Sequence, residues 1–472
     1  MIMRYWILIL CVVCLPCVAK EFPSLGISAN TVMSPAEEQE LGEAFIRQLR
    51  RQVEVIDDLQ INNYLNGLGQ LLASYSDNPG QPFRFFVIKD SSINAFAVPG
   101  GFVGVNSGLI LKSRSESELA SVLSHEIAHV TQRHIARTTE ASKRISLPAM
   151  AAAIVAAILI GGPQAGEAAM AVMTAGKIQM LINFTRAHEK EADRVGMQTL
   201  AKSGFDPRDM PSFFERLQAS SRYNDRGVPE FLRTHPVTTD RIAEARSRAE
   251  KYPLWSAKGT PHYHLTKAQL LVLTNENKPK LLKRLQKMLV DGNYRDERAI
   301  RYAVANTLLI LRKTSGVQTQ INWLLKNDGD RVIYRLVNAQ LALLQNEHAK
   351  AMRIYEQALQ VYPGDNILGL DYAEKLLQNN AAKKAKTVLL KISDTKNPDY
   401  YRLLAQAYQL TGAKAQAHLA LAEKHYLMGQ TKLALEQLKL ARKDKSLDFY
   451  SASRIEARYK ELKEEWLEEQ KL

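Results

Sequence analysis

The stretch Ser124-His125-Glu126-Ile127-Ala128-His129-Val130 carries the pattern H-E-x-x-H inside a run of helical periodicity that neither Gly nor Pro interrupts. On an α-helix, His125 and His129 stand four residues apart on one face, where two neutral imidazoles can bind one Zn²⁺. Glu126 lies about 100° round the helix, so its carboxylate can take a proton from a water on the metal. The pattern alone also fits an ordinary helix with two histidines, so zinc chemistry needs a third ligand.

A second helical stretch, Arg186-Ala187-His188-Glu189-Lys190-Glu191-Ala192-Asp193, offers that ligand. Glu189 and Asp193 share one helix face at a spacing of four, whereas Glu191 points elsewhere. A catalytic zinc site has three protein ligands and one open position, and Glu189 with the two histidines would provide them. Asp193 can accept a hydrogen bond from a ligand histidine. Such charged runs are usually solvated helix faces, but the coincidence with H-E-x-x-H outweighs that interpretation.

With these motifs the chain resembles the HtpX/CAAX-protease-like family of H-E-x-x-H zinc metallopeptidases. Further matches are the stretch from Asn94 to Gly101, the segment Thr234-His235-Pro236, and Arg241. The resemblance implies a zincin-like α+β fold and one Zn²⁺ per chain. It also implies that His125, His129 and Glu189 bind the zinc and that Glu126 is the general base.

The resemblance suggests two further site features. Zinc peptidases commonly hold a peptide as an added strand, and the family likeness assigns this role to Asn94, Ala95, Phe96 and Ala97; a plain hairpin is the alternative. His235 precedes a proline and is expected in a loop. It could stabilise the oxyanion of the reaction, or act as a candidate fourth ligand that silences the zinc until the loop moves. We expect the second role, and group His235 with Glu126 and Asp193 as the catalytic set.

The chain has 472 residues and a formal net charge of +14. The charge suits acidic partners, but no nucleic-acid-binding motif accompanies it, so we expect no nucleic-acid site. Residues 1–19 are typical of a secretory signal: Arg4 precedes an apolar stretch, and Cys17 and Ala19 supply the small residues for cleavage after Ala19. A retained anchor would need a longer apolar run. All three cysteines lie in this segment, which excludes disulfides and cysteine catalysis from the mature chain.

Residues 34–72 are predicted to be helical, and Ser34-Pro35-Ala36-Glu37 resembles a capping box. Short strands are predicted at 83–88 and at 95–105, the second broken by Pro99-Gly100-Gly101. Residues 147–160 are almost wholly apolar and rich in Ala but too short to span a membrane, and a second stretch rich in Ala and Met follows at 168–175. We expect a helical hairpin over the cleft there, with peripheral membrane or hydrophobic-substrate contact as the alternative.

From about residue 256 the pattern is helical and repeats every 34 residues, since Ala305, Ala339, Ala373 and Ala407 are evenly spaced. Within one unit Ala351, Ala358 and Pro363 follow at the positions of a tetratricopeptide repeat, and Ala422, Ala434 and Ala441 restart that frame. The predicted fold is therefore an α+β zincin-like peptidase domain (20–255) followed by an all-α tetratricopeptide-repeat superhelix (256–472), which would bind protein partners.

Two classes of function fit this organisation. The first is an exported zinc endopeptidase with a docking array. The second is a scaffold or chaperone in which the repeats carry the function, although a structural zinc site needs no neighbouring base such as Glu126. The family resemblance, which extends to the layout of leader, peptidase and repeats, implies a periplasmic quality-control enzyme, peripheral at the outer membrane. Its substrates would be unfolded or misassembled outer-membrane proteins, and its partner the barrel assembly machinery.

Overall fold

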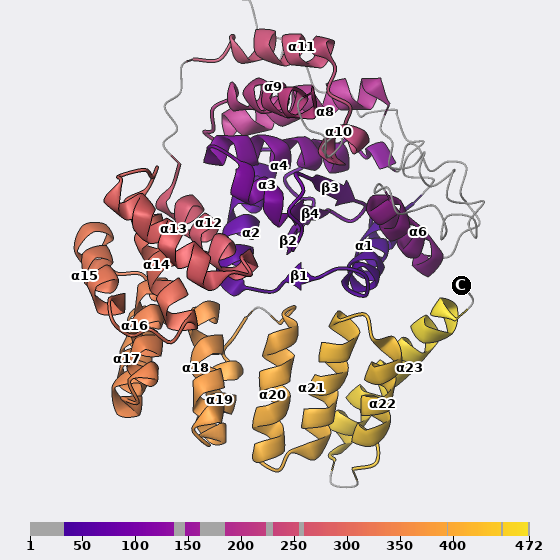
Figure 1. Ribbon diagram of the computed structural model, residues 1–472. Helices are drawn as coiled ribbons and strands as arrows, with labels where there is room; N and C mark the ends of the chain where they lie inside the picture. Colours follow the sequence, from indigo (N-terminus) through magenta and orange to yellow (C-terminus); the bar gives the residue numbers. More distant parts are fainter. Residues whose placement is uncertain are drawn as a thin grey trace, which may run out of the picture.

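The computed structural model describes residues 33–135, 147–160, 185–222, 230–253, 259–393, 395–444 and 447–470. The expected signal at 1–19 lies outside these residues. A small sheet with helices packed around it forms the N-terminal part, and a chain of helices follows it to the C-terminus (Figure 1). The predicted fold class, an α+β domain followed by an all-α repeat array, is confirmed.

The sheet has four short strands in the order β1-β2-β4-β3. Their bounds are Val55–Ile56 (β1), Arg84–Ile88 (β2), Ala95–Val98 (β3) and Phe102–Asn106 (β4). Strands β2 and β4 are parallel, and the other pairs are antiparallel. The tight β3–β4 connection requires positive φ at Gly100 (80°) and Gly101 (77°), a conformation that side-chain-bearing residues rarely adopt. This hairpin leaves β3 at the edge of the sheet.

The predicted helix over 34–72 is two helices, α1 (Pro35–Arg50) and α2 (Leu59–Ser74), with β1 between them. The capping box at Ser34 and Glu37 is present as expected. The single long helix was wrong because β-branched Val53, Val55 and Ile56 favour a strand. Asp58 then starts a new helix by accepting a hydrogen bond from the backbone of Ile61.

Helices beside the sheet carry the site residues. They are α3 (Ser107–Lys112), α4 (Glu116–Thr131), α8 (Arg186–Lys202), α9 (Asp209–Arg222), α10 (Glu230–Thr234) and α11 (Thr239–Ala249). Helix α4 lies in the centre and packs against α2, α8, α9 and β3. Its side chains from Glu116 to His129 are all buried. A central, buried helix holds its side chains in fixed positions, which suits it to carry H-E-x-x-H.

The apolar segment between the two motif helices begins with α6 (Leu147–Ile160), which packs against α1. Its second half, 161–175, lies outside the described residues, so the expected hairpin is not described. Within the described part of the chain, no helix combines the length and apolar character needed to cross a membrane.

The repeats comprise α12 to α23. Their bounds are Pro261–Thr274 (α12), Lys278–Val290 (α13), Glu297–Ile310 (α14), Val317–Asp328 (α15), Val332–Leu344 (α16), His348–Val361 (α17), Asn366–Gln378 (α18), Ala382–Leu389 (α19), Pro398–Leu410 (α20), Lys414–Leu427 (α21), Thr431–Ala441 (α22) and Phe449–Glu469 (α23). Each alanine that defines the predicted period is completely buried. The turn residues Arg312, Asn346 and Asn380 have positive φ and recur at the same interval. Small side chains therefore allow the close helix packing that the repeat pattern requires.

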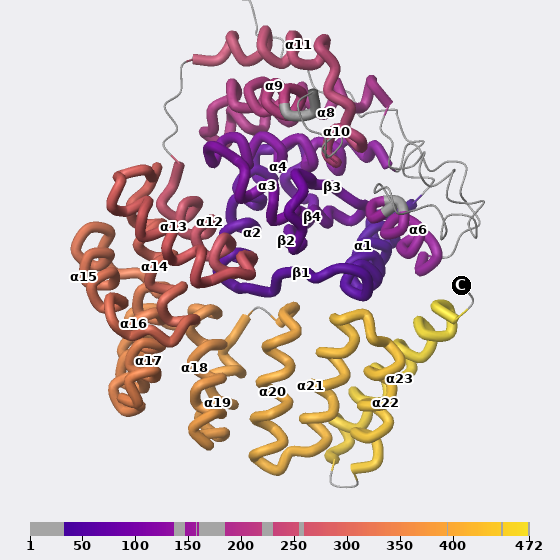
Figure 2. The backbone as a smooth tube through the Cα atoms, viewed as in Figure 1, coloured from indigo at the N-terminus to yellow at the C-terminus, as the bar shows by residue number. Residues whose placement is uncertain are grey.

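The repeat helices form an arc along the lower side of the peptidase domain (Figure 2). Helices α12 and α18 contact α2 at one end, and α23 contacts α6 at the other. Helix α12 belongs to both halves: Tyr263 and Leu270 join the peptidase core, whereas Leu265 and Val272 join the first repeat core. A boundary at residue 255 therefore separates Tyr263 from the core in which it is buried.

Candidate metal centre and active site

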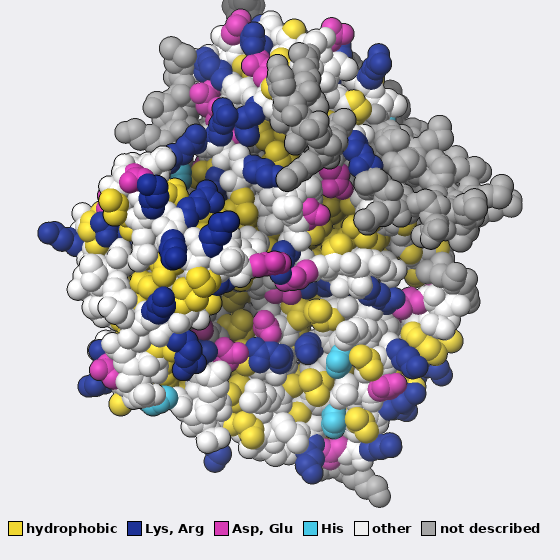
Figure 3. Space-filling view, in the orientation of Figure 1, with side chains coloured by type: hydrophobic (Ala, Val, Ile, Leu, Met, Phe, Trp, Pro, Cys, Tyr) yellow, Lys and Arg dark blue, Asp and Glu magenta, His cyan; other side chains and the backbone are white. Residues whose placement is uncertain are grey.

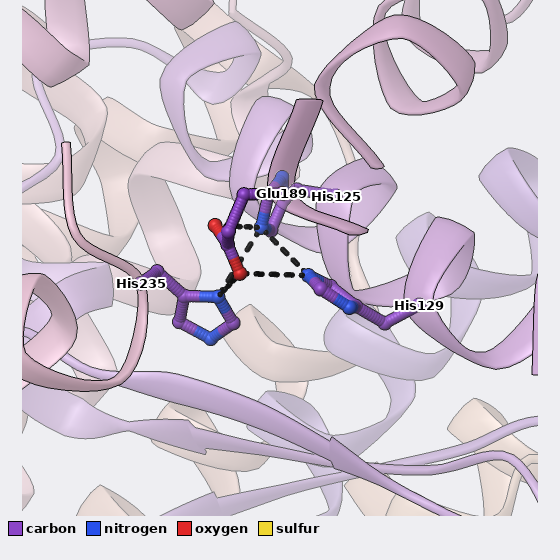
Figure 4. Close-up of side chains that lie close together, drawn as sticks. All are labelled: His125, His129, Glu189 and His235. Carbon is purple, nitrogen blue, oxygen red and sulfur yellow. Dashed lines mark hydrogen bonds and ion pairs between the residues drawn. The ribbon is translucent and has the colours of Figure 1, made fainter. Parts of the chain in front are cut away.

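Side chains from three segments converge on one point (Figure 4). His125 and His129 come from α4, Glu189 from α8, and His235 from the residue after α10. The Glu189 carboxylate lies 2.9 Å from His235 Nδ1 and 3.5 Å from both His125 Nε2 and His129 Nε2. His125 Nε2 is 3.0 Å from His129 Nε2 and 3.3 Å from His235 Nδ1. The four residues predicted as metal ligands therefore lie together.

These separations suit a tetrahedral metal. With bonds of about 2.0–2.2 Å to zinc, ligand atoms in a tetrahedron lie about 3.3 Å apart. Three ring nitrogens and one carboxylate oxygen are donors that zinc accepts. All four residues are at most 2% exposed. Burying such a cluster of polar groups costs free energy unless a partner compensates them, and a metal ion would do so. The residues present thus fit a bound metal ion.

The two motif helices approach each other closely. At Gly196 of α8, an added Cβ would lie 3.0 Å from backbone atoms of Ser124 and His125. That is tighter than ordinary van der Waals contact, so a larger residue would push the helices apart. Since Glu189 and Gly196 lie on the same helix, this contact sets how far the Glu189 carboxylate reaches toward the histidines.

A buried salt-bridge network supports the ligands. Asp193 Oδ1 lies 3.0 Å from His125 Nδ1, as the sequence predicted. Arg241 donates hydrogen bonds to both oxygens of Asp193 at 2.7 and 2.8 Å and to the Pro236 carbonyl at 2.7 Å. It also forms an ion pair with Glu189 Oε2 at 2.7 Å. One guanidinium thereby links the carboxylate ligand, its neighbour Asp193 and the segment of His235. Sequence reasoning matched Arg241 to the family but gave it no role.

His235 is held by its own short helix. It directly follows α10, outside the helix as expected, and its backbone N–H donates to the Phe231 carbonyl at 2.8 Å. The Phe231 ring stacks on the imidazole with centroids 4.8 Å apart. Phe231 is completely buried and its backbone N–H bonds to Ile93, next to β3. The imidazole therefore has a fixed orientation in this conformation.

Glu126 is completely buried beside the four-residue cluster, with Oε1 3.5 Å from His235 Nε2. Burial raises the pKa of its carboxyl, an environment that favours proton transfer. Burial disfavours a charge on His125, yet hydrogen bonds to Asp193 and Glu189 raise its pKa to about 10. Burial opposes charge on Glu189 too, but the facing imidazoles of His235, His125 and His129 hold the pKa of its carboxyl well below the usual range. The cluster therefore favours an ionised Glu189 carboxylate.

The predicted substrate strand lies next to this site. Asn94 to Ala97 are buried, and β3 packs against α4. Asn106 N–H bonds to the Asn94 carbonyl, and pairing alternates along antiparallel strands. Ala95 and Ala97 therefore direct their backbone groups to the free edge.

Two residues absent from the predicted site also contact it. His134 Nδ1 lies 2.9 Å from His129 Nδ1, and His134 Nε2 lies 3.0 Å from Glu191 Oε2. Glu191 is not part of the four-residue cluster, but its carboxylate binds a histidine that contacts one of the ligands. The only sequence signal was His134 itself, five residues after His129.

Comparisons with known proteins agree with this geometry. The profile described as Peptidase family M48 matches residues 60–249, and that of a Tetratricopeptide repeat matches 342–407. The chain is 34% identical to the Beta-barrel assembly-enhancing protease of Escherichia coli strain K12, over 94% of this chain and 92% of that one. This chain belongs to peptidase family M48.

Two further relatives match different shares of the chain. The Yersinia pestis Beta-barrel assembly-enhancing protease is 32% identical over 93% of this chain and 91% of its own. The Schizosaccharomyces pombe Mitochondrial metalloendopeptidase OMA1 is 31% identical over 34% of this chain and 44% of its own. Family membership and the four-residue cluster identify the chain as an M48 metalloendopeptidase with tetratricopeptide repeats.

Proposed function

We propose that this M48 peptidase is a periplasmic zinc endopeptidase that acts in the assembly of outer-membrane β-barrel proteins and cleaves unfolded or misassembled ones. The observation that carries the enzymatic part is the buried cluster of His125, His129, Glu189 and His235. The likeness over almost the whole chain to proteases named for β-barrel assembly supports the biological part.

Each site residue would have a separate role in peptide hydrolysis. When bound, zinc would polarise the scissile carbonyl and activate a water. His125, His129 and Glu189 would hold the metal, and Asp193 would fix the tautomer of His125. Glu126 would accept the proton of the attacking water and deliver it to the leaving amine. The free-edge backbone groups of Ala95 and Ala97 would align the substrate as an added strand.

His235 would act as a gate. Its Nδ1 lies among the ligand atoms, so it would occupy the fourth metal position in this conformation and leave no place for a water. Opening would require the α10 segment to move, and substrate entry is the simplest cause. His235→Ala should then raise proteolysis or reduce its selectivity. Lower activity with zinc retained would instead favour a role in stabilising the oxyanion.

The repeats would recruit the barrel assembly machinery. A groove of about 690 Å³ runs between α2 and the repeat helices, lined by residues that include Gln60, Tyr302, Leu336 and Asp371. A hollow is visible along this seam in Figure 3, and Lys and Arg are scattered over that face among acidic residues. Peripheral membrane contact through 147–175 remains part of the proposal.

Purified protein provides the test. Unfolded outer-membrane barrel protein should be cleaved in the presence of zinc and spared after chelation, whereas the folded barrel should resist. A chain that ends at residue 275 keeps α12 and should bind zinc but fail to bind the assembly machinery. Recruitment of that shortened chain would exclude the docking role of the repeats. Binding of zinc without any cleavage would favour the scaffold function.

A further inference from the structure

The two histidines of H-E-x-x-H are supported in different ways. His125 faces the Asp193 carboxylate directly at 3.0 Å. His129 turns its Nδ1 toward another imidazole, that of His134, at 2.9 Å, and a carboxylate follows one step later at Glu191. Metal-ligating histidines almost always donate their second ring N–H to a partner, and that partner sets tautomer and ring orientation.

The chain turns sharply to bring His134 under the last turn of α4. Helix α4 ends at Thr131, and Arg133 adopts a left-handed conformation with φ of 53°, which is uncommon for a non-glycine residue. The Arg133 guanidinium bonds to Glu38 and to the Met33 carbonyl, so α1 holds this turn in place. His134 is therefore completely buried beside His129.

The hydrogen bonds leave one consistent set of tautomers. If His129 Nε2 faces the metal, its Nδ1 carries the proton and must donate it. His134 Nδ1 is then the acceptor, so the His134 proton is on Nε2, where the Glu191 carboxylate accepts it. The three groups form a continuous chain in which each member has a single role. Loss of His134 would leave a buried N–H on His129 without that acceptor.

We propose that His134 is a positioning residue for the metal, with Glu191 holding it in the accepting tautomer. The proposal rests on the ligand set of the proposed function. The His134–Glu191 pair would orient His129 as Asp193 orients His125, so that both ligand rings are fixed before metal arrives. Preorganised ligands raise metal affinity, and loss of such a supporting group typically lowers it about 10- to 100-fold.

Two substitutions at His134 separate positioning from packing. His134→Leu keeps a similar volume and removes the acceptor, whereas His134→Asn can present Oδ1 where Nδ1 lies. We expect His134→Leu to weaken zinc binding about 10- to 100-fold in chelator competition, and His134→Asn to recover most of that loss. The visible absorption of the Co²⁺-substituted protein should shift in the leucine variant alone. Melting temperatures of the metal-free variants show whether each one folds.

A double substitution tests the chain of bonds. As a single substitution, Glu191→Gln should weaken zinc binding. Combined with His134→Leu it should cause no further loss of zinc affinity, because Glu191 acts only through His134. Glu244→Gln, which removes an acidic group that pairs with Lys190 and Arg248 on the surface, is the matched control and should bind zinc normally. Wild-type affinity in a folded His134→Leu variant, or an undiminished Glu191 effect in that background, would overturn the proposal. Failure of the wild-type chain to bind zinc would instead reject the ligand set.

Discussion

Arg241 balances two buried negative charges of the site with its single positive charge. It is 3% exposed and compensates two buried carboxylates, those of Glu189 and Asp193. Removing one partner of a buried ion pair typically costs about 3–5 kcal/mol, because the remaining charge is left without compensation. We expect Arg241→Met to lower the free energy of unfolding of the metal-free protein by about that amount. Urea unfolding measures it.

A surface arginine supplies the comparison. Arg246 pairs with Glu215 but is 61% exposed, and exposed pairs contribute about 0–1 kcal/mol. Arg246→Met should therefore change stability little. Equal losses in both variants would mean that Arg241 does not sustain the network.

Loss of Glu189 should abolish tight metal binding. Glu189→Ala removes the only oxygen donor of the cluster, so zinc content should fall to a small fraction of one per chain, whereas Glu191→Ala should still fill at saturating zinc. Because a ligand at 1,000 times its Kd stabilises the folded state by about 4 kcal/mol, chelation should lower the melting temperature of wild type and of Glu191→Ala but not that of Glu189→Ala. Full zinc content in Glu189→Ala would show that another residue supplies the third ligand.

Local spacing explains why the ligand candidates were visible in the sequence. Helical geometry alone aligns His125 with His129 and Glu189 with Asp193. His235 emerged through the motif likeness. Arg241 and His134 act through contacts between segments far apart in sequence or across a left-handed turn at Arg133, and no periodic pattern encodes those contacts.

At the level of secondary-structure elements, helices with strong sequence periodicity were predicted correctly, whereas the shortest strand was missed. The capping box of α1 and the alanine period of the repeats correspond to observed helices. The two-residue strand β1 was missed, because a strand that short has no alternation to detect and gains its stability from pairing with β2. The sheet order also could not be predicted, since it depends on long-range packing.

The edge strand gives a test at this scale. Ala95 directs its N–H to the free edge, so Ala95→Pro removes a bond to an added strand while leaving the β3–β4 ladder intact. We expect an increased KM for unfolded protein with zinc content unchanged. Phe96→Pro, which removes a ladder bond to Gly104, should instead destabilise the fold. Normal KM in a folded Ala95→Pro variant would exclude β3 as the substrate strand.

Across the whole molecule, salt bridges join the last repeat helix to the first peptidase helix. Arg47 pairs with Glu465, and Arg51 pairs with Glu469 and bonds to the Gly429 carbonyl. Arg47 also lies over the ring of Tyr426 at 4.4 Å. Together with the contact of α12 with α2, these bonds attach both ends of the arc to the peptidase.

Weakening this junction should loosen the arc without unfolding either part. Exposed pairs contribute about 0–1 kcal/mol and the partly buried Arg47 somewhat more, so Glu465→Gln with Glu469→Gln should cost roughly 1–3 kcal/mol. Spin labels on α1 and α23 should report a broader distance distribution, and zinc content should stay normal. An unchanged distribution would mean that apolar packing alone fixes the junction.

In the proposed mechanism, the buried Glu126 carboxylate beside the metal is the general base of peptide hydrolysis. Replacement of Glu126 by Gln keeps the shape of the side chain but removes its capacity to accept a proton. The decisive measurement is bound zinc together with the rate of cleavage of unfolded outer-membrane protein, wild type against Glu126→Gln. We expect one zinc per chain in both and a rate at least about 100-fold lower in the variant. An unchanged rate in Glu126→Gln would contradict this mechanism.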